Sequence, residues 1–368
     1  MTNFDVSNFY IRFSVVPFAA FRVASWNVAG LRAVLTKAPN IFVDFVKRHN
    51  IDVLCLQETK LQEQHLDDPK LNIKQTMGLS NEYDDFWSCS TAKKGYSGTA
   101  VFVRRRHNSN NATISTNSDM SNTAKVKSTK KQTSMLQFVK SKASELQNTG
   151  QAPSGNEDTA HDEVLSIDIN QLIPTSIAYV MGEKKHDMEG RLIVVDYPLF
   201  TLCNVYVPNA GQKLERLSYR VDEWDKDFLN FVHQKTKDRD GLPFIWLGDL
   251  NVAHTNLEVW NDGAKHLAKQ AGVTVEERAS FQEQLDAGHI DAFRHLHPTA
   301  AGHYSYWSMR AGNRAVNKGL RLDYFICDPK LFDDESQVVV RDCYMDSAQG
   351  GSDHCPVILE MEIKGAMK

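Results

Sequence analysis

Long apolar runs are missing from this sequence of 368 residues. No stretch approaches the roughly 20 apolar residues that a membrane-spanning helix requires, so we expect a soluble protein that does not contact a membrane. An excess of basic charge is missing as well, because 42 lysines and arginines stand against 46 acidic residues and leave a net charge of -4. Any surface that binds a polyanion must therefore be a local patch.

Cysteines are few, and no two of them have the spacing that zinc ligands favour. Most lie within apolar runs such as VLCLQ and FTLCNV, so we predict buried free thiols in a reducing compartment, with a disulfide framework as the alternative. The six cysteines are Cys55, Cys89, Cys203, Cys327, Cys343 and Cys355.

The first 20 residues lack the basic start and the small-residue cleavage site of a secretory signal. We interpret residues 1–20 as an N-terminal extension or a leading strand. An organelle-import segment is the alternative.

Large apolar residues nearly vanish between about residues 107 and 173, where Asn, Ser, Thr, Lys and Gln dominate. Such a segment cannot bury enough surface to offset the entropy lost on ordering. We therefore predict a disordered insertion that interrupts a single domain over residues 21–368. Its first half carries a basic cluster, which we interpret as a solvated loop, with a DNA-tethering arm as the alternative. The cluster comprises Lys125, Lys127, Lys130 and Lys131.

Short apolar runs with strand character recur on both sides of the insertion. A helical stripe over residues 41–46, a longer one over 214–232, and a capping box formed by Thr274 and Glu277 predict helices between some of them. Because strands and helices occur throughout, the pattern favours a mixed α/β sandwich whose buried sheets are covered by outer helices. The predicted strands cover residues 22–27, 52–57, 99–103, 192–197, 200–207, 243–248, 322–327 and 357–363.

Polar side chains stand directly at the ends of these predicted strands. Strand ends at one edge of a sheet converge in space, so residues far apart in the sequence can share one pocket. Gly248 would let the backbone approach its neighbours closely. Taken singly, each residue is more often a turn former or a helix cap, and only the combination indicates a site. The strand-end residues are Asn27, Glu58, Asn209, Asp249, Asn251 and Asp323.

These residue types suit phosphoryl chemistry with a hard cation. Magnesium prefers carboxylate and water oxygens and usually takes only one or two protein carboxylates, for which Glu58 and Asp353 are candidates. A phosphodiester under attack gains negative charge, which neutral donors such as Asn and Tyr stabilise together with the metal. His354, with Asp323 as a second strand-end acid, supplies an imidazole that an aspartate can orient.

Eight stretches resemble the exonuclease III branch of the endonuclease, exonuclease and phosphatase family, which contains the major abasic-site endonucleases. They are SWNVAGLRA, CLQETK, GYSG, EGR, YVPNAG, GDLNVAH, RLDYF and GSDHCP. The resemblance runs from about Phe21 to Ile363 without the insertion, and VPNAG and GDLNVAH are specific to the DNA-repair branch. It implies a four-layered α/β sandwich, with two face-to-face mixed β-sheets flanked by helices and one Mg²⁺-dependent site, in which Mn²⁺ is a substitute.

The resemblance implies metal ligation by Glu58, with Asn27 beside it and Asp353 assisting. Asp249 matches the residue that positions or deprotonates the attacking water. Because the family's mechanism is disputed, Asp249 also remains a candidate metal ligand.

Further positions match residues around the scissile phosphate. Asn251 and His354 match the residues that hold this phosphate, and both remain candidate metal ligands. Asp323 matches the partner that orients His354, and Tyr206 matches the tyrosine near the attacked phosphate or the leaving group.

DNA contacts are implied in the same way. Asn209 resembles a phosphate contact, and Tyr96 and Arg191 resemble residues that grip the strands. Tyr306 and Trp307 match two aromatic positions of an apolar pocket that accepts a flipped baseless sugar.

Three positions depart from the pattern of many relatives. Leu320 replaces a tryptophan of the pocket wall, Ala29 replaces an acid or amide near the metal, and Gln212 replaces an arginine that inserts into DNA in some members. Leu320 affects the expected tightness of substrate binding and the balance with 3′-end trimming. Ala29 predicts that a subsidiary metal contact is absent, and Gln212 predicts weaker product retention.

We expect an abasic-site endonuclease of base excision repair that acts as a monomer on duplex DNA and leaves a 3′-hydroxyl, with 3′-phosphodiesterase or 3′-5′ exonuclease side activity. The expected location is the nucleus, with the mitochondrion as a second location and a prokaryotic cytoplasm as the alternative, and other repair proteins are candidate partners. The alternatives are a phosphoesterase of the same fold that acts on 3′-blocked ends, RNA or another phosphoester, and a non-catalytic DNA-binding scaffold.

Overall fold

The computed structural model describes residues 18–106 and 169–365, whose strands form two mixed six-stranded sheets. The first has the order β11-β12-β1-β2-β4-β3 and the second the order β5-β6-β7-β8-β10-β9. Each contains one parallel pair, β1 with β2 and β7 with β8, among antiparallel neighbours. The first sheet comprises β1 (Phe18–Asn27), β2 (Val53–Gln57), β3 (Tyr83–Ser88), β4 (Thr99–Arg104), β11 (Val338–Met345) and β12 (Val357–Lys364). The second comprises β5 (Ser176–Ala178), β6 (Leu192–Asp196), β7 (Thr201–Val205), β8 (Phe244–Asp249), β9 (Ile290–Asp291) and β10 (Asp323–Cys327).

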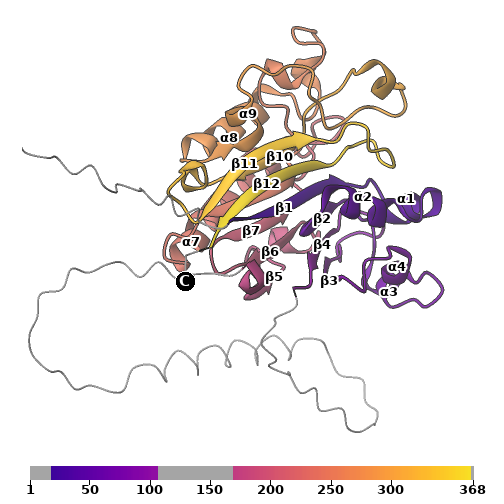
Figure 1. The fold of residues 1–368 in the computed structure, drawn as a ribbon. Helices are drawn as coiled ribbons and strands as arrows, with labels where there is room; N and C mark the ends of the chain where they lie inside the picture. Colours follow the sequence, from indigo (N-terminus) through magenta and orange to yellow (C-terminus); the bar gives the residue numbers. More distant parts are fainter. Residues whose placement is uncertain (1–17, 107–168, 366–368) are drawn as a thin grey trace, which may run out of the picture. The chain divides into compact units, whose positions relative to one another are not determined.

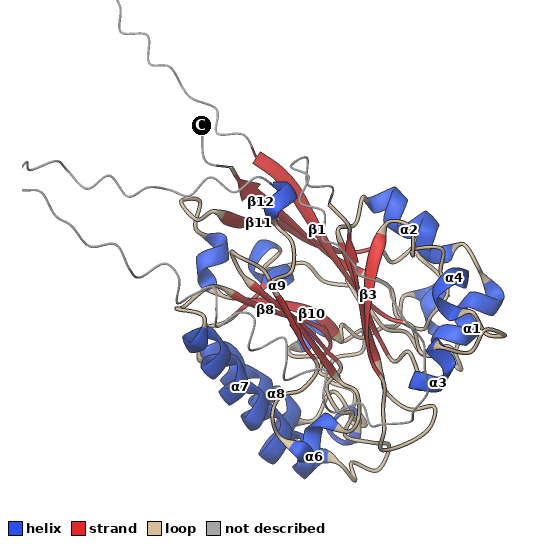
Figure 2. Cartoon of the chain, turned by 90° about the horizontal axis from the view of Figure 1, so that it is seen from below, coloured by secondary structure: helices blue, strands red, loops and turns tan. Residues whose placement is uncertain are grey.

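Helices cover the outer faces of both sheets (Figures 1 and 2). The first sheet is covered by α1 (Leu31–Lys37), α2 (Ile41–His49), α3 (Glu63–Leu66) and α4 (Ile73–Thr76). The second is covered by the π-helical η2 (Tyr219–Trp224), α7 (Asp225–Asp238) and α8 (Val275–Asp286), while α6 (Lys184–Asp187) follows β5 and α9 (Ala292–Leu296) packs near β10 and β11. The predicted four-layered α/β sandwich is therefore confirmed. No helix in the described part of the chain is long and apolar enough to cross a membrane.

Alternating side chains of each strand serve two apolar cores. In β8, Ile245 and Leu247 point into the core between the sheets, whereas Phe244 and Trp246 pack in the core beneath α7. Successive residues of a strand face opposite sides, and a strand covered on both faces reads as a continuous apolar run. This explains why β8 was predictable from its sequence.

Gly248 allows β7 and β8 to approach each other closely. Its φ is 140°, and an added Cβ would lie 1.8 Å from the carbonyl oxygen of Val205. Only glycine fits there, because any side chain would force the two strands apart. The close approach brings Asp249 beside the end of β7, where its carbonyl accepts a hydrogen bond from the backbone N–H of Val207 at 3.0 Å.

Both predicted domain boundaries differ slightly from those observed. Phe18 pairs with Lys364, so residues 18–20 belong to β1, which agrees with the leading strand and not with the extension that we offered for them. The short helix η1 (Ile169–Gln171) and the buried Leu172 pack with the domain, so the predicted insertion extends too far at its C-terminal end. The predicted disorder and the lysine cluster lie outside the described residues.

The six cysteines are free, and five are buried, as the apolar runs predicted. Burial raises the pKa of the Cys55 and Cys343 thiols well above their usual range. These thiols therefore stay protonated and act as small apolar side chains.

Candidate active site

A cleft of about 1130 Å³ brings the strand-end polar residues together. Its walls come from the residues that end or follow β1, β2, β7 and β8, and from the loop before β12. The predicted site residues among its lining are Asn27, Glu58, Tyr96, Tyr206, Asn209, Asp249, Asn251, Tyr306, Leu320, Asp353 and His354. Residues separated by more than 300 positions in the sequence thus share one cavity.

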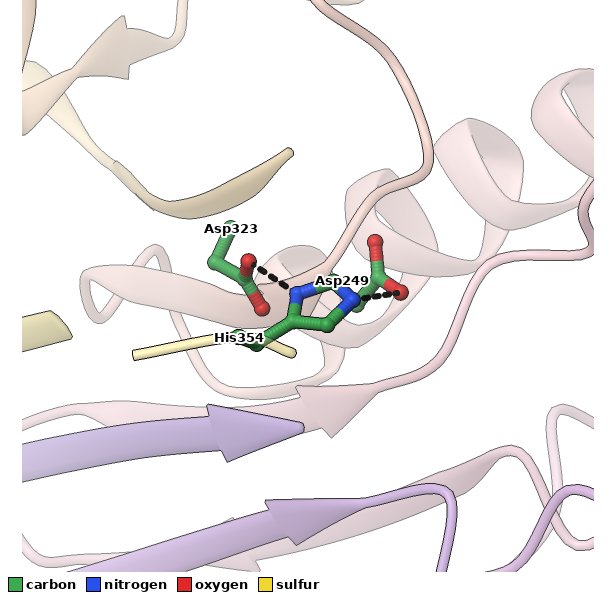
Figure 3. Close-up of side chains that lie close together, drawn as sticks. All are labelled: Asp249, Asp323 and His354. Atoms are coloured by element: carbon green, nitrogen blue, oxygen red, sulfur yellow. Dashed lines mark hydrogen bonds and ion pairs between the residues drawn. The ribbon is translucent and has the colours of Figure 1, made fainter. Parts of the chain in front are cut away.

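Asp249, Asp323 and His354 form a compact buried group, which we call the histidine cluster (Figure 3). Nδ1 of His354 lies 2.7 Å from Oδ2 of Asp323, and Nε2 lies 3.9 Å from Oδ2 of Asp249. Asp323 is held in turn, because its backbone N–H donates to the Ser305 hydroxyl at 3.0 Å. The imidazole is therefore fixed on one side and free to present its second nitrogen to the cleft.

The charges of this cluster oppose the effect of burial. Burial alone would lower the pKa of His354, but Asp323 and Asp249 raise it to about 10. Burial raises the pKa of Asp249 to about 7 even though the imidazolium of His354 lowers it. The raised pKa of His354 favours a cationic donor, and the raised pKa of Asp249 favours a carboxylate that takes up a proton more readily than a free one.

Amide groups surround Asp249. Asn27 Nδ2 donates to Oδ2 of Asp249 at 2.8 Å, and the backbone N–H of Asn251 donates to its Oδ1 at 2.9 Å. Asn209 Nδ2 donates to Asn251 Oδ1 at 2.8 Å, and Asn251 Nδ2 donates to the carbonyl of Val207 at 2.9 Å. These bonds orient the asparagine amides toward the space beside Asp249.

Glu58 lies on the same cleft and has two partners. Its Oε1 accepts a hydrogen bond from the Tyr206 hydroxyl, and its Oε2 lies 3.2 Å from Lys60 Nζ. Burial and then Glu58 raise the pKa of Tyr206 well above its usual range. Tyr206 is therefore a neutral hydrogen-bond donor at physiological pH.

Arg191 acts behind the cleft wall rather than in it. Its Nη2 donates to the Tyr96 hydroxyl at 2.7 Å, and its Nη1 donates to the carbonyl of Tyr206 at 2.9 Å. Arg216 Nη1 donates to the same Tyr96 hydroxyl at 2.5 Å. Arg191 is buried and reaches the cleft only through Tyr96, which lines it, so the expected DNA contact of Arg191 itself stays a prediction.

The two predicted pocket aromatics occupy different environments. Tyr306 lines the cleft with its ring centre 4.9 Å from that of His354. Trp307 is buried against Tyr304 and Cys355, and it does not belong to the cleft lining. Neighbouring residues of an extended segment point to opposite sides, which separates Tyr306 from Trp307.

Leu320 lines the same cleft, and its backbone pairs with two other segments. It forms bridges with Val259 and Tyr306, and Tyr306 forms a further bridge with His354. Leu320 therefore supplies the apolar surface expected at this position and is tied to the histidine cluster through Tyr306.

The donor set fits a hard divalent cation. Glu58 and Asp353 present carboxylates to the cleft, and Asp323 Oδ1 is a buried oxygen for which the described residues provide no hydrogen-bond partner. His354, Asp249 and Asn251 as further ligands stay predictions. The most compact set of metal-ligating types in the described chain is the histidine cluster, which does not contain Glu58.

Two serines of the site were missed from the sequence. Ser352 donates to the carbonyl of Asn27 at 2.7 Å, and its hydroxyl accepts from the backbone N–H of His354 at 3.2 Å. Ser305 accepts from the backbone N–H of Asp323. Ser352 lies in the GSDHCP motif, but no local signal marks Ser305.

Known proteins share this sequence and architecture. The sequence profile of the Endonuclease/Exonuclease/phosphatase family matches residues 24–107 and 153–354. The chain belongs to this family, in agreement with its fold and the composition of its cleft.

Particular relatives are also similar over most of the chain. A DNA-(apurinic or apyrimidinic site) endonuclease of Dictyostelium discoideum is 32% identical, covering 91% of this chain and 69% of the relative. An exodeoxyribonuclease of Bacillus subtilis is 30% identical, covering 93% of this chain and 100% of the relative. The solved structure of an AP endonuclease from Leishmania major superposes with a TM-score of 0.67 at 28% identity, covering 94% of this chain and 88% of that one.

Proposed function

We propose that this protein is an abasic-site endonuclease of DNA repair, which hydrolyses the phosphodiester 5′ to an abasic site in duplex DNA and leaves a 3′-hydroxyl. The observation that carries the proposal is the histidine cluster, in which His354 lies between Asp323 and Asp249 at the wall of a cleft. The similarity to the named nucleases supports DNA as the substrate.

We assign proton transfer to Asp249 and charge stabilisation to His354. Asp249 accepts the proton of a water whose oxygen attacks phosphorus, which its pKa of about 7 allows at neutral pH. As the bond from phosphorus to the 3′-oxygen breaks, the imidazolium of His354 donates a hydrogen bond to a phosphate oxygen. Asp323 keeps the imidazole in place by binding Nδ1.

Tyr206 and the two asparagines complete the proposed set. The neutral hydroxyl of Tyr206 donates toward the leaving oxygen, while Asn251 and Asn209 bind the phosphate. Glu58 and Asp353 would hold the cation, with Asn27 beside them. When bound there, Mg²⁺, or Mn²⁺ as a substitute, supplies Lewis-acid stabilisation of the charge on the phosphate and the leaving oxygen.

For the biological setting we propose base excision repair in the nucleus, with the mitochondrion as a second location. The enzyme acts as a monomer on duplex DNA, with other repair proteins as candidate partners. The described residues 18–106 and 169–365 form the catalytic domain in this proposal.

The test is a panel of matched oligonucleotides with Mg²⁺ and with chelator. We expect the abasic-analogue duplex to be nicked on its 5′ side only when Mg²⁺ is present, and Glu58→Ala to lose this dependence together with the activity. An intact duplex of the same sequence is the control substrate. If the wild-type protein leaves the abasic duplex uncut, the proposal is wrong.

A second candidate is the removal of groups from 3′ ends. The similarity to an exodeoxyribonuclease over its whole length favours it, as does Leu320, which offers less flat apolar surface than the tryptophan of many relatives. A duplex with a recessed 3′-phosphate, tested beside the abasic duplex and an RNA substrate, decides which activity dominates.

DNA binding should also depend on salt despite the net acidic chain. Lys93, Lys269 and Arg216 line the cleft and can contact phosphates. Because each phosphate contact contributes a slope of about -0.9 in log affinity against log salt, we expect a steep loss between low and physiological salt. A flat response would contradict binding in this cleft.

A further inference from the structure

Arg314, in the 3-10 helix η5 (Asn313–Val316), binds the backbone of a second segment, the loop of residues 346–356 between β11 and β12. Its Nη1 donates to the carbonyl of Ser352 at 3.0 Å, and its Nη2 donates to the carbonyls of Ser347 and Gln349 at 2.9 Å and 2.6 Å. Its guanidinium carbon lies 4.7 Å from the centre of the Trp307 ring, as in a cation–π contact. Three hydrogen bonds and one stacking surface hold this side chain in a single orientation.

Ser352 links Arg314 to residues that line the cleft. Its carbonyl binds Arg314, its hydroxyl donates to the carbonyl of Asn27 at 2.7 Å, and the same hydroxyl accepts from the backbone N–H of His354 at 3.2 Å. Asp353 is the next residue in the chain. A displacement of Ser352 would therefore move two walls of the cleft together, one at the end of β1 and one before β12.

On its other side, the loop of residues 346–356 is bound by side chains of α2, among them His49, whose Nε2 lies 2.9 Å from Oδ2 of Asp346. Arg48 of α2 donates to the side chains of Asp346 and Gln349 at 2.9 Å and 2.6 Å, but the Arg48 side chain is 52% exposed. Solvent-exposed ion pairs contribute little. Neither contact of Arg48 involves the backbone of Ser352, so of these two arginines only Arg314 binds Ser352 directly.

We propose that Arg314 is a positioning residue of the reaction, which holds Ser352 and thereby sets Asn27, Asp353 and His354 around the reacting phosphate. Arg314 acts through these residues and touches no reacting atom. The expected effect of Arg314 on the reaction rate rests on the proposed function. The expected effect of Arg314 on the position of His354 does not.

The test compares Arg314→Ala and Arg314→Lys with the wild-type protein on the abasic-analogue duplex. Misplacement of catalytic groups by about 1 Å can cost on the order of 100-fold in rate. We expect the single-turnover rate of Arg314→Ala to fall roughly 10- to 100-fold. The dissociation constant for DNA should change less than the rate. Lysine keeps the charge but lacks the planar fork that reaches several carbonyls, so Arg314→Lys should restore only part of the rate.

Arg239→Ala is the matched control. Arg239 donates to the carbonyls of Phe200 and Tyr197 at 2.9 Å and 2.5 Å, in the turn between β6 and β7 at the end of these strands away from the cleft. We expect it to lower the melting temperature but to leave the single-turnover rate unchanged. The proposal is wrong if Arg314→Ala loses no more rate than this control. It is also wrong if only the dissociation constant rises, which would make Arg314 a direct DNA contact.

A second readout separates this proposal from the proposed function. The ring resonances of His354 should shift in Arg314→Ala and stay in place in Arg239→Ala, whatever the substrate. Unchanged His354 resonances in Arg314→Ala would overturn the positioning role. Failure of the wild-type protein to nick abasic DNA would overturn the function alone.

Discussion

Two buried ionic clusters in this protein differ in the charge around their carboxylates. The arginine cluster joins Glu258 and Asp291 to Arg321 at 2.9 Å and 2.6 Å, and Arg294 binds Glu258 from the other side at 2.5 Å. In the histidine cluster, two carboxylates share one imidazole. The first cluster therefore has as many cations as carboxylates, and the second does not.

The pKa values show the consequence of this difference. Burial raises the pKa of both Glu258 and Asp249, but Arg321 and Arg294 bring that of Glu258 down to about 2. Near Asp323 and Glu58, the pKa of Asp249 remains raised, at about 7. A fully paired carboxylate serves the fold, whereas an under-compensated one can accept a proton at neutral pH.

The largest expected difference between the two clusters is in the nicking rate after one charge is removed from each. Asp249→Asn is expected to lower the nicking rate by roughly 10²- to 10⁴-fold, the usual contribution of a general base. The unfolding free energy should stay the same or rise, because the substitution removes one negative charge from a cluster that has more carboxylates than cations. Asp291→Asn is the control from the arginine cluster and should keep the rate of the folded enzyme. Equal losses of rate in both variants would contradict the distinction.

The arginine cluster should dominate stability instead. Glu258→Gln leaves Arg321 with less compensation in a buried place, and breaking such a pair costs roughly 3–5 kcal/mol. Urea unfolding measures the loss, and the nicking rate under native conditions should be retained. A stability change below about 1 kcal/mol, as for a surface pair, would show that the cluster is not the structural one.

Stability should also depend on pH in opposite ways for the two clusters. The arginine cluster should lose part of its contribution at acid pH, and the histidine cluster at alkaline pH. The folded-state pKa of Glu258 falls from 4.5 to about 2, so its contribution is present above about pH 4.5 and is lost as the pH drops toward 2. That of His354 rises from 6.5 to about 10, so its contribution is present below about pH 6.5 and is lost as the pH rises through 10. Urea midpoints across pH 2–10 test this. Glu258→Gln should flatten the acid limb and His354→Gln the alkaline limb, and an unchanged alkaline limb in His354→Gln would contradict the assignment.

The smallest effect is expected from an exposed ion pair. Arg48 lies 2.9 Å from Asp346, but the arginine side chain is 52% exposed. Arg48→Ala should change the unfolding free energy by no more than about 1 kcal/mol, and added salt should reduce even this difference. A loss as large as that of Glu258→Gln would mean that burial does not set the strength of these clusters.

The fold was predictable where a strand is apolar on both faces, as in β1 and β8. It was not predictable for β3, where Asp84 and Asp85 interrupt the apolar pattern, or for the two-residue β9. The capping box of Thr274 and Glu277 starts α8 as predicted. Elements such as β8 and α8 can be predicted from local sequence, because each is determined mainly by the residues of its own segment.

The site residues also divide into those that the local sequence identified and those that it did not. Asn27 and Asp249 were identified because they end strands, whereas their contact at 2.8 Å joins residues 222 positions apart and was not predicted. Trp307 was placed in the pocket because Tyr306 and Trp307 together match two aromatic positions of the family, although alternation along the chain turns Trp307 away. The bond of Arg314 to Ser352 joins residues 38 positions apart and has no local signal.

The central claim is that the side chains of the histidine cluster act as one catalytic unit. A double-mutant cycle on Asp249→Asn and His354→Gln, measured by single-turnover nicking of the abasic duplex with saturating Mg²⁺, tests it most directly. Each single variant should lose most of the rate, and the double variant should lose little more than the worse single one. Losses that add fully in free energy, or a His354→Gln rate equal to that of the wild type, would contradict the claim.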